Sequence, residues 1–194
     1  MEQLVEWDKA FFLYLNGQHT SWLDPIMMVL SHRLTWVPLY LMLLVFIIRR
    51  HGRESWIPVV GIALTILLAD QVCSSLLKPL FARLRPSHEP SLDGLVHIVD
   101  GYRGGHYGFA SSHAGNTFGL AMFFVLRYHR IWKWTWILFP WAAIVAYTRI
   151  YLGVHYPGDV IVGALIGMLA AYAGHRTCRL LKKAIHGRRP TSAV

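Results

Sequence analysis

Three short clusters of polar and ionisable residues could carry chemistry in this sequence, and each lies at the end of an apolar run. The clusters are Lys78 with Arg85-Pro86, then Ser111-Ser112-His113, then Thr148-Arg149 with His155 and Asp159. Together they supply three cations, two histidines and one carboxylate. This set matches the needs of phosphoryl transfer, because a transferring phosphoryl group spreads negative charge over its oxygens and is stabilised mainly by positioning and electrostatics.

The three cations are candidate phosphate ligands. An arginine fork suits two phosphate oxygens at once, whereas a lysine acts as a point charge. We therefore expect Lys78, Arg85 and Arg149 to bind the phosphate. Ser111 or Ser112 is the expected N-cap of a helix whose free backbone N–H groups would form a further anion site.

The two histidines have different expected roles. His155 is the candidate nucleophile, since a neutral imidazole can attack phosphorus and form a phosphohistidine. Asp159 follows four residues later and could accept a hydrogen bond from the other ring nitrogen, which would fix the tautomer. His113 is the candidate acid that protonates the departing alkoxide, and it could then help to activate water.

Each of these residues alone also has a simpler interpretation. A single lysine or arginine near a helix end commonly anchors the helix among the lipid headgroups. A single histidine at a helix end is more often a polar residue whose hydrogen bonds are satisfied. The combination of all three clusters favours the catalytic interpretation.

The segments that hold these clusters are apolar enough for a lipid bilayer. Of the 194 residues, 55% are hydrophobic and 15% are charged, whereas a soluble domain carries about 25% charged residues. The formal net charge is +9, and many basic residues gather beside apolar runs, in segments 49–53, 127–133 and 182–189. This placement fits cytoplasmic loops under the positive-inside rule, so the expected partner is the membrane and not nucleic acid.

The predicted fold is all-α, a polytopic bundle of transmembrane helices. Its candidate spans are residues 23–48, 56–77, 113–126, 134–151 and 160–181. Ser31-His32-Arg33 interrupt the first run, so it either crosses once or is broken, and the expected total is about five to six spans. Residues 1–20 have apolar side chains at helical spacing, which predicts an amphipathic helix that lies in the interface or docks on the bundle.

We expect a single membrane domain over residues 1–194, with the catalytic signature at 78–159 and a flexible tail at 187–194. Cytoplasmic basic loops would place residues 79–112 and 152–159 together on the outer side of an inner membrane. The N-terminal residues lack the order of a cleaved signal peptide. Cys73 and Cys178 give no disulfide framework. The oligomeric state is left open.

Two further features carry structural expectations. Gly163 and Gly167 form a small-residue face in the last apolar run, which predicts close packing against a neighbouring helix. Asp70 lies inside the second run, where we expect a hydrogen bond to another helix and no contact with phosphate. His32 and Arg33 are expected to be interfacial anchors, with contact to a lipid headgroup as the alternative.

The three clusters resemble the signature of the type 2 phosphatidic acid phosphatase superfamily of membrane lipid phosphatases. The resemblance covers roughly residues 78–159. In that family the first part of the signature binds phosphate, the second holds the acid histidine, and the third holds a phosphate-binding arginine, a nucleophilic histidine and a supporting aspartate. The matching residues are Lys78, Arg85 and Pro86, then His113, then Arg149, His155 and Asp159.

The sequence departs from the family pattern at two points. The usual Pro-Ser-Gly-His is Ala110-Ser111-Ser112-His113 here, and the usual Ser-Arg is Thr148-Arg149. Neither change removes a charged or proton-carrying group. The resemblance therefore still implies an active enzyme.

The resemblance implies a hydrolase that removes phosphate from a membrane lipid without a metal or other cofactor. Undecaprenyl pyrophosphate and lipid A phosphate are the favoured substrates, and phosphatidylglycerophosphate and phosphatidic acid are also considered. The outer loops offer few acidic ligands for magnesium, mainly Glu89, Asp93 and Asp100. Two alternatives remain open at this point: a lipid-to-lipid phosphotransferase, and a non-catalytic lipid transporter or scaffold of the same fold.

Headgroup selection is assigned to the long outer loop that precedes His113. Its candidate selectors are Tyr102, Arg103, His106 and Tyr107. The sequence does not say which headgroup they select.

Overall fold

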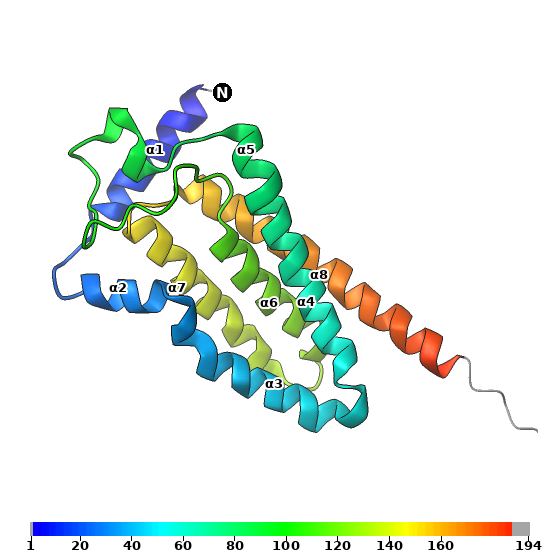
Figure 1. Ribbon diagram of the computed structural model, residues 1–194. Helices are drawn as coiled ribbons and strands as arrows, with labels where there is room; N and C mark the ends of the chain where they lie inside the picture. The colour runs from blue at the N-terminus through cyan, green and yellow to red at the C-terminus, as the bar shows by residue number, and fades with distance from the viewer. Residues whose placement is uncertain (1, 188–194) are drawn as a thin grey trace, which may run out of the picture.

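The computed structural model describes residues 2–187, and these residues form helices and connecting loops with no β-strand among them. The helices are α1 (Glu2–Asn16), α2 (Asp24–Ser31), α3 (Val37–His51), α4 (Trp56–Asp70), α5 (Lys78–Phe81), α6 (Ser112–Tyr128), α7 (Leu138–Tyr151) and α8 (Pro157–His186) (Figure 1). The predicted all-α class is confirmed. The predicted flexible tail lies outside the described residues, except for Gly187.

Three helical segments are long and apolar enough to cross a membrane, namely Arg33–Glu54, Trp56–Phe81 and Pro157–His186. Helices α6 and α7 have 17 and 14 residues, and both are shorter than a full span of about 20 residues. The fold is thus an all-α membrane helical fold. The count of about five to six spans remains a prediction.

The centre of the bundle is built by α8 packed against α6 and α4. Glycines allow this approach, because a Cβ atom at Gly163 would meet the backbone oxygen of Ser111 and one at Gly167 would meet that of Gly115. The backbone N–H of Ser111 also donates to the Asp159 carbonyl oxygen at 3.0 Å. The predicted close packing of the small-residue face is confirmed, and it fixes the start of α6 beside the start of α8.

The first apolar run is broken and is not one continuous helix. Helix α2 ends at Ser31, His32 is extended, and a 3-10 turn over Arg33–Trp36 leads into α3. The His32 ring accepts a hydrogen bond from the Leu34 backbone at 3.4 Å, and the Trp36 indole donates to the Leu30 carbonyl at 2.8 Å. The break lets α2 pack against α7 near one end of the bundle.

The second apolar run changes its helical pitch immediately before Lys78. Helix α4 continues into a π-helical segment over Gln71–Leu77 and then into the short helix α5. The chain leaves α5 at Ala82, whose φ of 44° is left-handed. Since π-helical segments are rare and often mark functional sites, this irregularity singles out the turn that carries Lys78.

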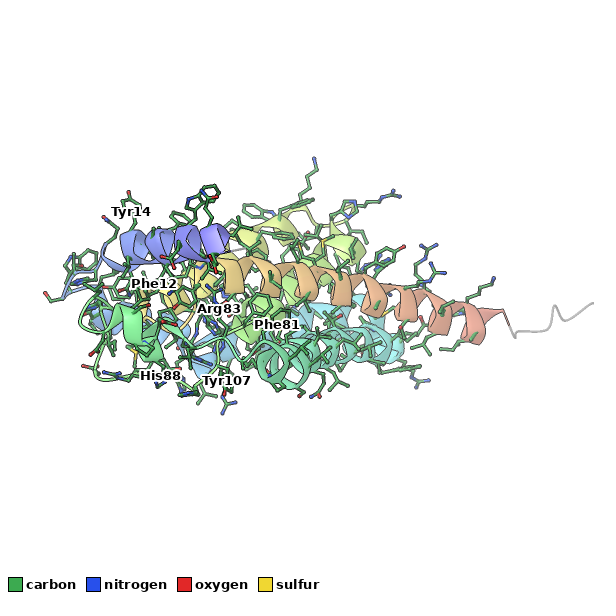
Figure 2. The ribbon with its side chains drawn as sticks, turned by 90° about the horizontal axis from the view of Figure 1, so that it is seen from above. Phe12, Tyr14, Phe81, Arg83, His88 and Tyr107 are labelled. Atoms are coloured by element: carbon green, nitrogen blue, oxygen red, sulfur yellow. The ribbon has the colours of Figure 1, made fainter. Side chains whose placement is uncertain are left out.

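Helix α1 docks on the bundle and also exposes an aromatic face. Phe12 is fully buried against Tyr156, whereas Trp7 and Tyr14 are more than half exposed; Figure 2 shows Phe12 and Tyr14 on different sides of α1. The Asn16 amide donates to the Tyr151 carbonyl at 2.8 Å, which ties the end of α1 to α7. Docking is therefore established, while a position in the membrane interface remains a prediction.

The two ends of the bundle carry different segments of the chain. The loop after α5, the turn between α7 and α8, and α1 lie at one end, whereas the α3–α4 turn, the end of α6 and the end of α8 lie toward the other (Figure 1). The described residues of the basic segments predicted to be cytoplasmic thus lie away from the three polar clusters. This relative placement agrees with the expectation, and the side of the membrane that each end faces remains a prediction.

Candidate active site

Lys78 meets the start of α6 through two serines. Its Nζ atom lies 3.2 Å from Ser112 Oγ and 3.4 Å from Ser74 Oγ, and the two hydroxyls are 3.0 Å apart. Ser74 lies one helical turn before Lys78, so the π-helical segment and the start of α6 together hold the ammonium group.

Ser111 is the N-cap of α6. Its buried side chain accepts a hydrogen bond from the Ala114 backbone N–H at 3.5 Å, as expected for a cap. Ser112 is then the first helical residue, and its hydroxyl faces Lys78. The sequence left both serines as candidates for the cap. In the structure Ser111 caps the helix, whereas Ser112 contacts Lys78.

Arg85 enters the site from the loop after α5 and is largely buried, with 8% of the residue exposed. Its Nε atom donates to the Tyr107 carbonyl at 3.0 Å, beside a single antiparallel bridge between Leu84 and Tyr107. Gly104 lies so close that a Cβ atom would collide with the guanidinium group. The long loop therefore wraps around Arg85 and fixes its direction.

Arg149 projects from the last turn of α7 and is held by two residues from other elements. One terminal nitrogen donates to Ser31 Oγ at the end of α2, and the other donates to the Tyr102 hydroxyl at 3.0 Å. The Nε atom is buried and has no hydrogen-bond partner among the described residues. Arg149 therefore connects the end of α7 to the end of α2 and to the long loop.

His155 lies in the turn between α7 and α8 and is almost completely buried, as is Asp159 in the first turn of α8. His155 Nδ1 is 3.4 Å from Asp159 Oδ2, which also accepts from the Tyr156 backbone at 3.0 Å. Burial, and then the charges of Arg85, Arg149 and Lys78, hold the pKa of His155 well below its usual value. The imidazole is therefore neutral at neutral pH.

His113 lines two cavities at the same end of the bundle. A cavity of about 230 Å³ extends between His113, Arg149 and Tyr102, and it also contacts His32 and Arg33. A second cavity, of about 240 Å³, is lined by His113, Ser112 and Asp70 among others. His113 is thus accessible from the cavity that reaches Arg149.

The environment of Asp70 differs from the expectation. Its only hydrogen-bond partner among the described side chains is Ser74 of the same helical segment, at 3.3 Å, and not a residue of another helix. Asp70 lines the cavity that contains Ser112 and His113. The prediction of an interhelical bond was wrong, because Ser74, one helical turn after Asp70, provides the hydrogen bond from within the same segment. The Ser74 hydroxyl, and not the Asp70 carboxylate, contacts the other helix, at Ser112 of α6.

Several of the predicted loop selectors bind the protein itself. Tyr102 contacts Arg149, the backbone of Tyr107 contacts Arg85, and Arg103 donates to the Ser87 carbonyl at 3.0 Å. His32 and Arg33, which the sequence predicts to be interfacial anchors, line the cavity at Arg149. The turn between α2 and α3 is therefore a second candidate surface for headgroup contacts, beside the exposed His106 and Tyr107 side chains, and headgroup selection remains a prediction.

Four residues near the site were missed by the sequence interpretation, and the first is Ser74, which contacts Lys78. Ser31 bonds Arg149, and Arg83 bonds both Asp159 and Asp8. Arg83 carried a signal, since it is a basic residue inside the spacer between Lys78 and Arg85. Ser31 and Asp8 carried none, because their contacts join segments far apart in the chain.

The site brings three cations to one neutral imidazole. Among the residues that contribute side chains to it, the described contacts give only Asp159 and Asp70 as carboxylates. Residues 2–187 contain no group of three histidine, cysteine, aspartate or glutamate side chains arranged to hold a metal ion. An anion with the charge of a phosphate dianion would relieve the repulsion between these cations.

Comparison with known proteins now decides the family. The sequence matches the PAP2 superfamily over residues 56–186, a stretch that includes all three clusters. The chain belongs to this superfamily. The resemblance drawn from the signature residues is confirmed.

Individual relatives give the same result. The chain is 44% identical to the lipid A 4'-phosphatase of Bacteroides thetaiotaomicron, over 86% of this chain and 75% of that protein. It is 39% identical to the lipid A 4'-phosphatase of Porphyromonas gingivalis, over 89% and 73% of the two chains. The crystal structure of Aquifex aeolicus LpxE superposes with a TM-score of 0.67 at 28% identity, covering 86% of this chain and 93% of that one.

These similarities extend to activity. The PAP2 protein described here is a membrane lipid phosphatase, a phosphoric monoester hydrolase, as the signature implied. The alternatives of a phosphotransferase and of a non-catalytic scaffold are not better supported. The comparisons leave the roles of individual residues and the identity of the substrate to the site itself.

Proposed function

We propose that this PAP2 phosphatase hydrolyses a phosphate monoester of lipid A through a phosphohistidine on His155. The observation that carries the proposal is the buried neutral imidazole of His155, paired with Asp159 and surrounded by Lys78, Arg85 and Arg149. A neutral imidazole is a nucleophile, and the cations neutralise the charge that would otherwise repel it from phosphorus.

In the first step the Nε2 atom of His155 attacks phosphorus, because Nδ1 faces Asp159. A phosphorus–nitrogen bond forms and the bond from phosphorus to the sugar oxygen breaks. The departing oxygen takes a proton from His113, whose protonated form the bound phosphate dianion favours by offsetting the charge of the three cations, and the lipid leaves as an alcohol. Asp159 stabilises the positive charge that the imidazole ring gains.

In the second step water attacks the phosphohistidine. His113, now neutral, takes a proton from the water, and the phosphorus–nitrogen bond breaks to return His155 to its neutral form. Inorganic phosphate leaves and the site is restored. The net reaction is a phosphate monoester plus water giving an alcohol plus phosphate, with no electron transfer and no metal required.

Lipid A is favoured over the other substrates by two observations. Two relatives at 44% and 39% identity carry the name lipid A 4'-phosphatase. The cavity at Arg149 also opens past His32 and Arg33, which would place further basic groups beside a large anionic headgroup. We propose the 4'-phosphate as the bond that is cleaved, at the outer face of the inner membrane, where the basic segments would lie in the cytoplasm.

A substrate panel tests this proposal directly. Purified protein in detergent is given lipid A, undecaprenyl pyrophosphate, phosphatidylglycerophosphate and phosphatidic acid, with excess chelator present. We expect phosphate release to be fastest from lipid A, and mass spectrometry with fragmentation to show loss from the 4' position. Release of free phosphate, and not its transfer to a second lipid, distinguishes hydrolysis from phosphotransfer.

Two variants accompany the panel. His155→Ala should abolish turnover. With lipid phosphates, whose leaving group is an alcohol that needs a proton, His113→Ala should lower the rate by about a hundredfold to ten-thousandfold. The His113→Ala loss should be much smaller with a nitrophenyl phosphate, whose leaving group needs no proton. Normal rates in both variants would end the proposed mechanism, and hydrolysis of undecaprenyl pyrophosphate alone would replace the proposed substrate.

A further inference from the structure

Arg83 joins the N-terminal helix to the aspartate that supports the nucleophile. Its Nη1 atom lies 3.0 Å from Asp159 Oδ1 and its Nη2 atom lies 2.8 Å from Asp8 Oδ2. The guanidinium carbon also lies 3.9 Å from the centre of the Tyr156 ring. Figure 2 shows Arg83 between α1 and the start of α8.

Asp8 has a second contact that fixes its position. Its Oδ1 atom accepts a hydrogen bond from the Gly158 backbone N–H at 2.8 Å, in the first turn of α8. Gly158 permits this approach, because a Cβ atom there would lie 2.8 Å from Asp8 Oδ2. Asp8 therefore holds Arg83 and the first turn of α8 at the same time.

Both oxygens of the Asp159 carboxylate are thus occupied. Oδ1 accepts from Arg83, whereas Oδ2 accepts from the Tyr156 backbone and faces His155 Nδ1. Asp159 is fully buried, so its carboxylate is shielded from bulk solvent and its rotation is restricted. A buried carboxylate needs a charged partner to stay ionised, and Arg83 is the cation bonded to it.

We propose that Arg83 and Asp8 are positioning residues for catalysis, which keep the Asp159 carboxylate ionised and directed at His155. This inference depends on the proposed role of His155 and Asp159. It assigns the N-terminal helix a part in the chemistry that lies outside the three-part signature. A simple anchoring role for α1 is the competing explanation.

The test uses conservative variants and a neighbour as control. Arg83→Gln removes the charge, and Arg83→Lys keeps a charge that cannot span both carboxylates. Asp8→Asn removes the charge yet keeps an oxygen for the Gly158 N–H. Lys9→Gln is the matched control, because Lys9 follows Asp8 on α1 and bonds Ser91 and Glu89 without touching Asp159.

We expect Arg83→Gln to lower kcat/KM by about tenfold to a hundredfold, by analogy with the range found when the partners that orient metal-bound histidines are removed. Asp8→Asn should cause a smaller loss, and Lys9→Gln should match the wild type. The acid limb of the pH profile of kcat/KM should move to higher pH in Arg83→Gln, since a carboxylate that loses its cation binds a proton more readily. Arg83→Lys should restore part of this shift.

The double variant Asp8→Asn with Arg83→Gln separates the two explanations. If Asp8 acts through Arg83, the double variant loses no more activity than Arg83→Gln alone. Additive losses with an unmoved acid limb, or wild-type rates in Arg83→Gln, would overturn the inference in favour of anchoring. Asp159→Asn separates failure of this inference from failure of the proposed function. Full activity in that variant would show that Asp159 has no role in catalysis, which would contradict part of the proposed function itself.

Discussion

At the scale of single residues, the site depends on how burial and charge set the state of an imidazole. The three cations each reach the site from a different segment, and each is held by a neutral hydrogen-bond acceptor: Ser112 for Lys78, the Tyr107 carbonyl for Arg85, and Ser31 and Tyr102 for Arg149. Neutral acceptors leave the positive charge of these groups uncompensated. The charge is therefore available both to bind phosphate and to keep His155 unprotonated.

The depressed pKa of His155 predicts a particular pH dependence of stability. Burial, followed by Arg85, Arg149 and Lys78, lowers the pKa of His155 in the folded protein, whereas an unfolded histidine titrates near about 6.5. Below that pH the unfolded chain binds a proton that the folded protein does not. The free energy of unfolding should thus fall as pH drops from about 6.5 toward the folded pKa, by up to about 1.4 kcal/mol per pH unit.

His155→Gln should abolish this contribution. We expect the stability of the wild type relative to His155→Gln to decrease on acidification, as measured by melting temperatures in one detergent over a pH series. His106→Gln, in the exposed part of the outer loop, is the control and should follow the wild type. A difference between wild type and His155→Gln that is constant with pH would contradict the assigned state of the imidazole.

At the scale of elements, the register between α6 and α8 decides whether the three clusters meet. The Ser111 N–H bonds the Asp159 carbonyl, and Gly163 lies against the Ser111 backbone one turn further along α8. The start of α6 carries His113, and the start of α8 carries Asp159. A change in the spacing of these two helices would therefore move His113, the proposed acid, relative to Asp159, the proposed partner of His155.

Gly163→Ala tests this dependence. The added methyl group would collide with the Ser111 backbone, so we expect a loss of about 1–3 kcal/mol in stability, the usual range for overpacking, together with reduced phosphate release. Melting temperature and turnover are the measurements. Leu169→Ala, on an exposed position of the same helix, should change neither by much. Gly163→Ala with wild-type melting would show that the helices can separate without cost.

At the scale of the whole molecule, the described residues of the three basic segments named from the sequence lie toward the end of the bundle opposite the candidate site. The site end carries α1, the long loop and the α7–α8 turn, and the other end carries the α3–α4 turn and the end of α8 (Figure 1). Arg127, Arg179 and Lys182 line a cavity of about 610 Å³ among basic residues at that second end. This asymmetry is what the positive-inside rule needs to orient the protein.

Cysteine labelling tests the orientation. Asp93→Cys places a thiol in an exposed part of the long loop, and Arg53→Cys places one in the α3–α4 turn, while the native cysteines are buried. In spheroplasts, a membrane-impermeant maleimide should label Asp93→Cys at once and Arg53→Cys only after the membrane is opened. The reverse order would place the site in the cytoplasm.

The sequence by itself was enough to predict phosphate chemistry and a lipid-bilayer environment for this protein. Residue types at fixed spacing identified Lys78, His113 and His155 as parts of one signature, and apolar runs identified the bilayer, because hydropathy and side-chain chemistry are local properties. The small-residue face of α8 was readable for the same reason. These expectations needed no knowledge of which segments touch.

Only the tertiary structure decided how the catalytic groups are held. The bond from Arg83 to Asp8 joins residues 75 positions apart, and the bond from Gly158 to Asp8 joins residues 150 apart. The break after Ser31, which lets that serine reach Arg149, likewise depends on the packing of α2 against α7. Such contacts follow from the packing of whole helices, and no local pattern of residues specifies them.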